Sequence, residues 1–267
     1  MILFVFEGVN REPTLFKTLE YLYFAQNKVV RICSYNNNIY NLYKQMTESD
    51  FPEDIITILK RKLITDKDNP LKEIRRRSDF SEVYLFFDYD CHNNQDINLS
   101  NQQLQEMLDF FNDESSDFGK LFINYPMVES IYYSKNPLPD MDFNSYTTPI
   151  SLGKDFKKKV NEESYYKNLD FITFRMNKKK FEIKVPEDKT KIATIRQNWE
   201  FLQEMNVKKA NFICTGNDKL PETENVVNQQ NIFSNQLSKY VNPKSEVAIL
   251  NSFPLFIYEY KGKIKDS

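Results

Sequence analysis

Two short apolar runs constrain this chain more than any other feature. Ile2–Phe6 and Val83–Phe87 are rich in β-branched and aromatic side chains, and no charged residue interrupts either of them. Such continuous runs are typical of strands buried on both faces, as in a parallel sheet that helices cover. We therefore predict an α/β fold with a mostly parallel sheet flanked by helices.

Each apolar run ends in acid. Glu7 and Gly8 follow the first run, and Asp88 and Asp90 follow the second. Ligands of parallel sheets bind outside the carboxyl ends of the strands, so we expect Glu7, Asp88 and Asp90 to converge there. Gathered carboxylates repel one another and favour a hard divalent cation. In an extended segment Asp88 and Asp90 point the same way, so both reach one metal ion while Tyr89 packs elsewhere.

A simpler interpretation of these acids stands beside the metal site. An acid after an apolar strand is often a strand terminus or a helix cap. For the Asp-x-Asp pattern alone, that structural interpretation is favoured. The combination of Glu-Gly after one strand and Asp-x-Asp after another reverses the balance toward a metal site.

The rest of the chain alternates strand and helix patterns before becoming mostly helical. Further strands are predicted at Lys28–Cys33 and Lys120–Tyr125, and helices at 12–23, Ile39–Met46, Pro52–Leu63 and Gln102–Asn112, with another starting at Pro126. The segment 136–149 contains three prolines and little periodicity, which predicts a linker. We therefore expect a catalytic domain over 1–135 and a mainly helical region over 150–267, in which Phe171–Val185 fits either strand or helix.

Composition excludes several classes of protein. Hydrophobic residues make up 40% of the chain and aromatic residues 15%, which supports a packed core and argues against global disorder. Only 5 glycines occur, without GxGxxG or GxxxxGK[ST], so a glycine-rich nucleotide loop is excluded. His92 is the single histidine, which excludes a multi-histidine metal site.

The same composition bears on location and charge. The 3 cysteines include no CxxC pair, which favours a reducing cytoplasm over a disulfide framework. No run approaches the roughly 18 apolar residues of a membrane span, so we expect no membrane association. The net charge of −2 does not indicate a nucleic-acid binder. The run Arg75–Arg77 fits a nucleic-acid contact, but a solvated charged segment is the favoured interpretation.

The acidic motifs resemble those of a known family. The stretches EGVNREP and FFDYD are similar to a Toprim domain, the fold shared by topoisomerases, DnaG-type primases and overcoming-lysogenization-defect (OLD) nucleases. More narrowly, EGVNREPTLF resembles the opening of RloB-like and AbiL-type proteins, and FFDYD followed by INYPMVES fits the same group. These proteins resemble the Toprim half of two-gene bacterial anti-phage systems, in which the other gene encodes an ABC- or AAA-type ATPase, and AriB of the PARIS system is related.

The resemblance implies roles for particular residues and a Mg²⁺ or Mn²⁺ cofactor. Glu7, Asp88 and Asp90 would be the catalytic residues and metal ligands, with Glu12 as a supporting ligand and Glu129 completing a second metal site. A lysine facing the scissile phosphate is also implied, and Lys120 and Lys154 are the candidates. Lys157–Lys159 and Lys178–Lys180 either grip a phosphate backbone or form a solvated face. Cys91 follows Asp90 where many relatives have glycine, and His92 is either a phosphate ligand or an exposed loop residue.

Two functions of different classes follow from the resemblance. The first is a metal-dependent endonuclease that cuts tRNA or DNA as a toxic defence effector, restrained or triggered by the ATPase and forming a homodimer when active. The second is a non-catalytic sensor or adaptor that binds the ATPase through the aromatic segment Phe253–Tyr260. A primase-like polymerase is less favoured, because the chain contains no zinc module.

Overall fold

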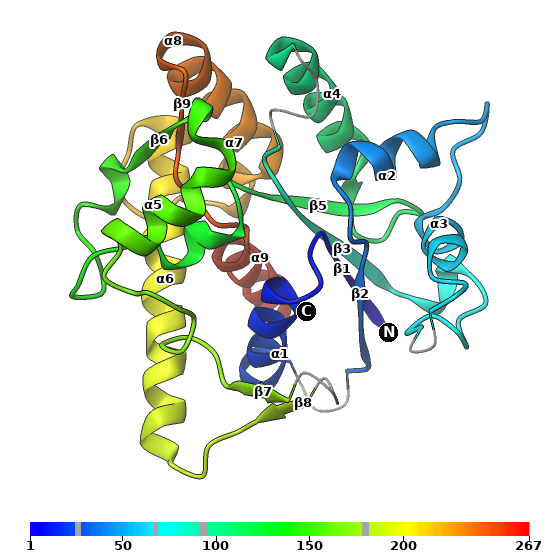
Figure 1. The fold of residues 1–267 in the computed structure, drawn as a ribbon, viewed down its shortest axis with the longest axis horizontal. Coiled ribbons are helices and arrows are strands. Elements are labelled where there is room, and N and C mark those ends of the chain that lie inside the picture. The colour runs from blue at the N-terminus through cyan, green and yellow to red at the C-terminus, as the bar shows by residue number, and fades with distance from the viewer. Residues whose placement is uncertain (25–27, 67–68, 91–95, 178–181, 267) are drawn as a thin grey trace. The chain divides into compact units, whose positions relative to one another are not determined.

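The first half of the chain contains a five-stranded sheet (Figure 1). The computed structural model describes residues 1–24, 28–66, 69–90, 96–177 and 182–266. The strands are β1 (Ile2–Phe6), β2 (Val30–Ser34), β3 (Glu82–Asp88), β4 (Asn112–Asp113) and β5 (Gly119–Asn124), in the order β2-β1-β3-β5-β4. Strands β2 and β3 both run parallel to β1, while β4 is antiparallel to β5. The prediction of an α/β fold with a mostly parallel sheet is confirmed.

The two apolar runs form the centre of this sheet. Every residue of β1 is buried, and β3 is buried from Val83 to Phe87, as expected for strands covered on both faces. Side chains of a strand alternate between the two faces. One face holds an aromatic cluster, in which the centroid of the Phe86 ring lies 5.6 Å from that of Phe6 and 5.3 Å from that of Phe122. This packing is consistent with the strand register, which pairs Phe6 with Phe86.

The helices follow the predicted order, with some shifted ends. The α-helices are α1 (Arg11–Tyr23), α2 (Ile39–Met46), α3 (Ile55–Lys62), α4 (Ile97–Phe110), α5 (Phe156–Glu163), α6 (Lys189–Thr215), α7 (Gln229–Gln236), α8 (Asn242–Lys244) and α9 (Ser252–Asp266). Helix α4 begins before the predicted Gln102 because the Asp96 carboxylate caps it, accepting from the Asn98 amide at 2.8 Å. After Pro126 the chain forms a 3₁₀ turn over Val128–Tyr132 and not the α-helix that we predicted.

The described chain groups into two compact units. The first unit contains Met1–Pro13 and Tyr23–Phe122, and the second contains Thr14–Leu22 and Ile123–Ser267. Most of α1 therefore belongs to the second unit, where the Phe174 amide donates to the Thr18 hydroxyl at 3.0 Å. This grouping differs from the predicted boundary, because the proposed linker 136–149 falls wholly inside the second unit.

The second unit is mainly helical and includes two small two-stranded sheets. Strand β6 (Thr147–Pro149) pairs with β9 (Glu246–Ala248), so the end of the proposed linker is part of a sheet. Strands β7 (Arg175–Asn177) and β8 (Glu182–Lys184) are antiparallel, so two described parts of the ambiguous segment Phe171–Val185 are strands. Helix α6 spans 27 residues and buries Trp199, whose indole N–H donates to the Ile172 carbonyl at 2.7 Å.

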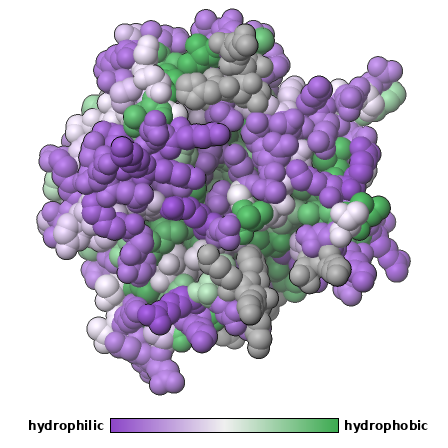
Figure 2. All heavy atoms as spheres, in the orientation of Figure 1, coloured by the Kyte–Doolittle hydropathy of each residue, from purple (hydrophilic) through white to green (hydrophobic). Residues whose placement is uncertain are grey.

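The surface of the described residues is largely hydrophilic. Figure 2 shows polar residues over most of the visible face, with apolar residues in small separate patches. Among the described helices, none is long and apolar enough to cross a bilayer.

Candidate functional site

Glu7 and Asp88 meet at the carboxyl edge of the sheet. The backbone amide of Glu7 continues the ladder to β3 by donating to the Phe86 carbonyl at 3.0 Å. Its carboxylate Oε2 in turn accepts a hydrogen bond from the Asp88 amide, also at 3.0 Å. Both residues are only partly buried. The first-strand acid and the third-strand acid are therefore neighbours, as the sequence predicts for a parallel register.

Asp90 lies just beyond β3, and the chain turns there. The Asp90 amide donates to the Asp88 carbonyl at 2.9 Å, which is a tight turn and not the extended geometry that we expected. Tyr89 is 4% exposed, and its hydroxyl donates to Asn101 Oδ1 at 2.6 Å. The expectation that Tyr89 packs away from the acids is thus confirmed. The binding of one ion by both Asp88 and Asp90 stays a prediction.

Glu12 is held against the backbone of Gly8. Its carboxylate is almost fully buried in the first turn of α1 and accepts from the Gly8 amide at 3.0 Å. A Cβ atom at Gly8 would lie 2.7 Å from Glu12 Oε2. The glycine after the first strand is therefore needed for the close approach of this carboxylate. In this position Glu12 shapes the loop that follows Glu7.

The donor set at this edge suits magnesium or manganese. Magnesium is usually bound through one or two protein carboxylates together with waters and substrate phosphates, and Glu7 and Asp88 supply that number of hard oxygen ligands. Within the described part of the chain, no group of three or more His, Cys, Asp or Glu side chains is placed to hold a metal ion. The chemistry of the pair thus fits the ion, while a cage made wholly of protein ligands is not formed by these residues.

The remaining predicted site residues are divided between the two units. Glu129 belongs to the second unit, is fully buried and forms an ion pair with Lys157 at 3.2 Å. Lys154 is exposed, ahead of α5. Lys120, on β5 in the first unit, lies 5.9 Å from the centre of the Phe122 ring. The structure thus brings together Glu7 and Asp88 and pairs two other predicted residues, Glu129 and Lys157, with each other.

Some of the predicted residues are not described. Cys91 and His92, together with the Lys178–Lys180 run, fall outside the described residues, so their predicted roles stay predictions. Of the Arg75–Arg77 run, Arg77 is buried and donates to the carbonyls of Phe80, Glu114 and Ser116. Arg75 and Arg76 are exposed. This is the structural interpretation of the run, with Arg77 as an anchor for neighbouring turns.

The sequence analysis did not identify a group of side chains on and beside β2, formed by Cys33, Tyr35 and Lys62. The ammonium of Lys62, at the end of α3, lies 3.8 Å from the centre of the Tyr35 ring. Burial raises the pKa of the Cys33 thiol to about 12 and that of the Tyr35 hydroxyl to about 12. It lowers the pKa of Lys62. No sequence motif links β2 to α3, so only the fold reveals this proximity.

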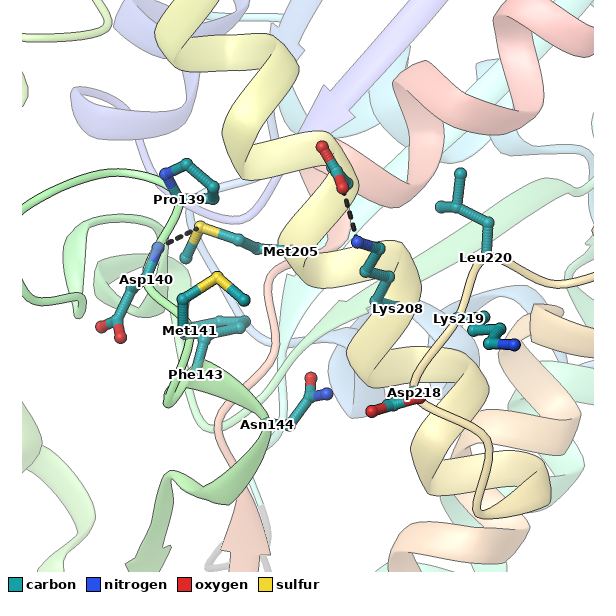
Figure 3. Close-up of a pocket in the computed structure, with 11 residues that line it drawn as sticks. Pro139, Asp140, Met141, Phe143, Asn144, Met205, Lys208, Asp218, Lys219 and Leu220 are labelled. Atoms are coloured by element: carbon teal, nitrogen blue, oxygen red, sulfur yellow. Dashed lines mark hydrogen bonds and ion pairs between the residues drawn. The ribbon is translucent and has the colours of Figure 1, made fainter.

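The second unit contains a pocket of about 630 Å³ beside α6 (Figure 3). The residues that line it include Met205, whose sulfur accepts a hydrogen bond from the Asp140 amide at 3.3 Å. Acidic and basic side chains also line it, among them Lys208 and Glu204, which form an ion pair at 2.5 Å. None of the predicted catalytic residues lines this pocket, so its chemistry does not belong to the acidic edge.

The comparisons with known proteins found no match. No family model matches the chain, and no curated protein and no solved structure does so. The geometry of the acidic edge is therefore the basis for any functional assignment.

Proposed function

We propose that this chain is a metal-dependent endonuclease of the Toprim type, active on tRNA or DNA in the cytoplasm. In this proposal it is the toxic effector of a two-gene anti-phage system, restrained or triggered by an ABC- or AAA-type ATPase. The observation that supports it best is the hydrogen bond from the Asp88 amide to the Glu7 carboxylate. It joins the two acids of the Toprim-like motifs at the edge where parallel sheets bind ligands.

The residues of the chain have separate tasks in this proposal. The Asp88 amide orients the Glu7 carboxylate by binding one of its oxygens, while the Asp88 side chain supplies a second carboxylate at the strand end. Glu12 fixes the loop after Glu7 through the Gly8 amide. A bound Mg²⁺ or Mn²⁺ would neutralise phosphate charge, activate water and stabilise the leaving oxygen.

A cleavage assay with matched variants tests the proposal. Wild type, Glu7→Gln and Asp88→Asn are incubated with total tRNA, single-stranded DNA and duplex DNA, in Mg²⁺, Mn²⁺ or EDTA. Glutamine retains an oxygen that can accept from the Asp88 amide, so Glu7→Gln removes charge without removing the hydrogen bond. Asp109→Asn is the control, because this exposed α4 carboxylate lies outside the motifs.

The expected result is metal-dependent cutting by wild type and Asp109→Asn that both motif variants lose. Because an effector can require its ATPase, the assay is repeated with the co-purified complex from the native gene pair. Cutting by the motif variants at the wild-type rate, or no cutting by the complex under inducing conditions, would contradict the proposal.

The adaptor alternative depends on the aromatic segment Phe253–Tyr260 as its docking surface. Side chains of the C-terminal aromatic segment are buried, with Phe253, Phe256 and Tyr260 at most 4% exposed. These three side chains pack within the chain. An adaptor role would therefore need another surface, and we retain the nuclease as the proposal.

A further inference from the structure

The last turn of α3 contains three cations that differ in their partners. Lys60 donates to the Ile74 carbonyl at 2.5 Å, and Arg61 pairs with Glu53 at 2.5 Å. Lys62 has neither kind of partner among the described residues. Its ammonium instead lies over the Tyr35 ring, in a cation–π contact. Two cations of this turn are thus occupied by the protein, and the third remains available to a ligand.

A second cation, Arg31, lies on strand β2 and has no acidic partner among the described residues. Strand β2 is an edge strand of the sheet, and Arg31 is partly buried. Its Nε atom is buried, with no hydrogen-bond partner among the described residues. A buried guanidinium nitrogen without a partner is costly, and it calls for a water or ion that completes its hydrogen bonds.

The strand geometry places these cations along one face. Arg31, Cys33 and Tyr35 alternate along the chain, so their side chains share a face of β2. Lys62 interacts with both Cys33 and Tyr35 from α3. Arg31 and Tyr35 are four positions apart, roughly 13 Å along a strand. Arg31 and Lys62 therefore lie along the same edge of the sheet and not at a single point.

This face leads to the acidic edge. The Tyr35 amide donates to the Phe6 carbonyl at 2.7 Å, and the next amide, that of Asn36, donates to the Glu7 carbonyl at 2.9 Å. Tyr35 therefore lies beside Glu7 across the β1–β2 pair. It is fully buried, and its hydroxyl has no hydrogen-bond partner among the described residues. Because this side chain is enclosed by the protein, Tyr35 supports Lys62 and is not itself a ligand-binding group.

We propose that Arg31 and Lys62 bind the phosphodiester backbone of the nucleic acid that the acidic edge acts on. This inference rests on the proposed function. Arginine matches phosphate with its planar fork of donors, and lysine with a point charge. A strand that follows β2 past Arg31 and Lys62 arrives at Glu7. The exposed Asp66, whose charge acts on Cys33, is the acidic group that opposes this binding.

The test measures binding without cleavage. Fluorescence anisotropy follows a labelled 20-nucleotide single-stranded DNA and the matching RNA in EDTA, at several salt concentrations. Lys62→Ala and Arg31→Ala should each weaken binding about tenfold, and each should reduce the slope of log affinity against log salt by about 1. Asp66→Asn should bind more tightly. Lys72→Ala removes the same charge from an exposed site in the same unit and should bind like wild type.

Two further arms make the outcome decisive. Lys62→Met keeps the aliphatic chain over Tyr35, so weak binding by this folded variant, judged from its circular dichroism and melting temperature, identifies the lost charge as the cause. Inorganic phosphate and a mononucleotide are tested as competitors. If they bind the site as tightly as the oligonucleotide does, the site is one for free phosphate and the proposal is overturned. Wild-type affinity in folded Lys62→Ala and Arg31→Ala overturns it as well.

Failure of this inference is distinguishable from failure of the nuclease proposal. Binding through Arg31 and Lys62 in EDTA without cleavage in Mg²⁺ or Mn²⁺ by the co-purified complex would remove the nuclease and leave the binding site. If the wild type cleaves nucleic acid but the Arg31 and Lys62 variants bind it as tightly as wild type does, the nuclease proposal stands and the proposed binding site is removed.

Discussion

Two acids of the first unit and two buried charged residues of the second unit are held in opposite ways. In the first unit, Glu7 and Asp88 lie partly exposed at a sheet edge and are joined through a backbone amide. In the second unit, Glu129 and Lys209 are completely buried, and each has a partner within the protein. Lys209 donates to the carbonyls of Phe143 and Tyr146, at 2.8 and 2.6 Å.

This difference distinguishes acids that are placed to bind a ligand from acids that stabilise the fold. Glu7 and Glu129 both follow apolar strands, and the sequence pattern treats them alike. The Glu7 carboxylate is partly exposed at the sheet edge and accepts a hydrogen bond from a backbone amide. Glu129 is neutralised by Lys157. A carboxylate already paired with a cation is a poorer metal ligand, because binding must first break the ion pair.

The largest expected effect comes from exchanging the two acids for glutamine. Glu7→Gln should reduce metal-dependent cleavage at least about 100-fold, since the loss of even an outer metal-site partner can cost 10- to 100-fold. Glu129→Gln should change the cleavage rate less than about threefold, because its charge is used within the fold. Initial rates on the best substrate, with melting temperatures as the control for folding, make the comparison. Equal losses of cleavage rate in both variants would instead support the predicted role of Glu129 as a metal ligand.

The second prediction concerns the buried cation. Lys209→Met removes both hydrogen bonds to the carbonyls of Phe143 and Tyr146, so the free energy of unfolding should fall by about 2 kcal/mol or more. Lys208→Met is the control on the same helix. It removes only an i,i+4 ion pair with Glu204, at a cost of roughly 0.5 kcal/mol. Urea denaturation of both variants measures the difference. Equal unfolding free energies for the two variants would show that Lys209 does not stabilise the fold through these hydrogen bonds.

The pH dependence gives this prediction a second test. Burial lowers the pKa of Lys209 well below that of a free lysine, so the unfolded chain binds this proton more tightly than the folded chain. Stability contributed at this site therefore rises with pH, from the lowered folded pKa up to the unfolded value. The difference in unfolding free energy between wild type and Lys209→Met should grow over that range. A difference that does not vary with pH would contradict this.

The sequence predicted the acidic edge better than it predicted the surroundings of that edge. Ile2–Phe6 and Val83–Phe87 are short, continuous and bounded by acids, so local pattern alone defines β1 and β3 and their shared end. The aromatic segment Phe253–Tyr260 has equally clear composition, but its exposure depends on distant packing, and the fold buries it. Lys62 lies beside Tyr35 only because α3 packs near β2, and periodicity does not encode that contact.

The third prediction tests the exposed cation that pairs with the buried Glu129. Lys157→Met leaves the fully buried Glu129 carboxylate without the ion pair that the structure gives it. Lys157 is itself 57% exposed, so solvent screening reduces the effect to about 1–2 kcal/mol of unfolding free energy. Lys158→Met, which loses only an exposed pair with Glu162, is the control. If Lys157→Met weakens nucleic-acid binding and leaves stability unchanged, its predicted role as a backbone contact holds instead.

The smallest effect is expected where the first unit shapes its own edge. Gly8→Ala places a methyl group 2.7 Å from Glu12 Oε2, so the carboxylate must move and its hydrogen bond to the Gly8 amide is lost. The expected cost is about 1 kcal/mol of unfolding free energy. In a Glu12→Ala background the same substitution meets no carboxylate and should cost less than about 0.5 kcal/mol. Denaturant unfolding of the four proteins in this double-mutant cycle measures the coupling. A Gly8→Ala cost that is the same in both backgrounds would mean that Glu12 does not require glycine at position 8, and that the Glu-Gly pattern after β1 has another cause.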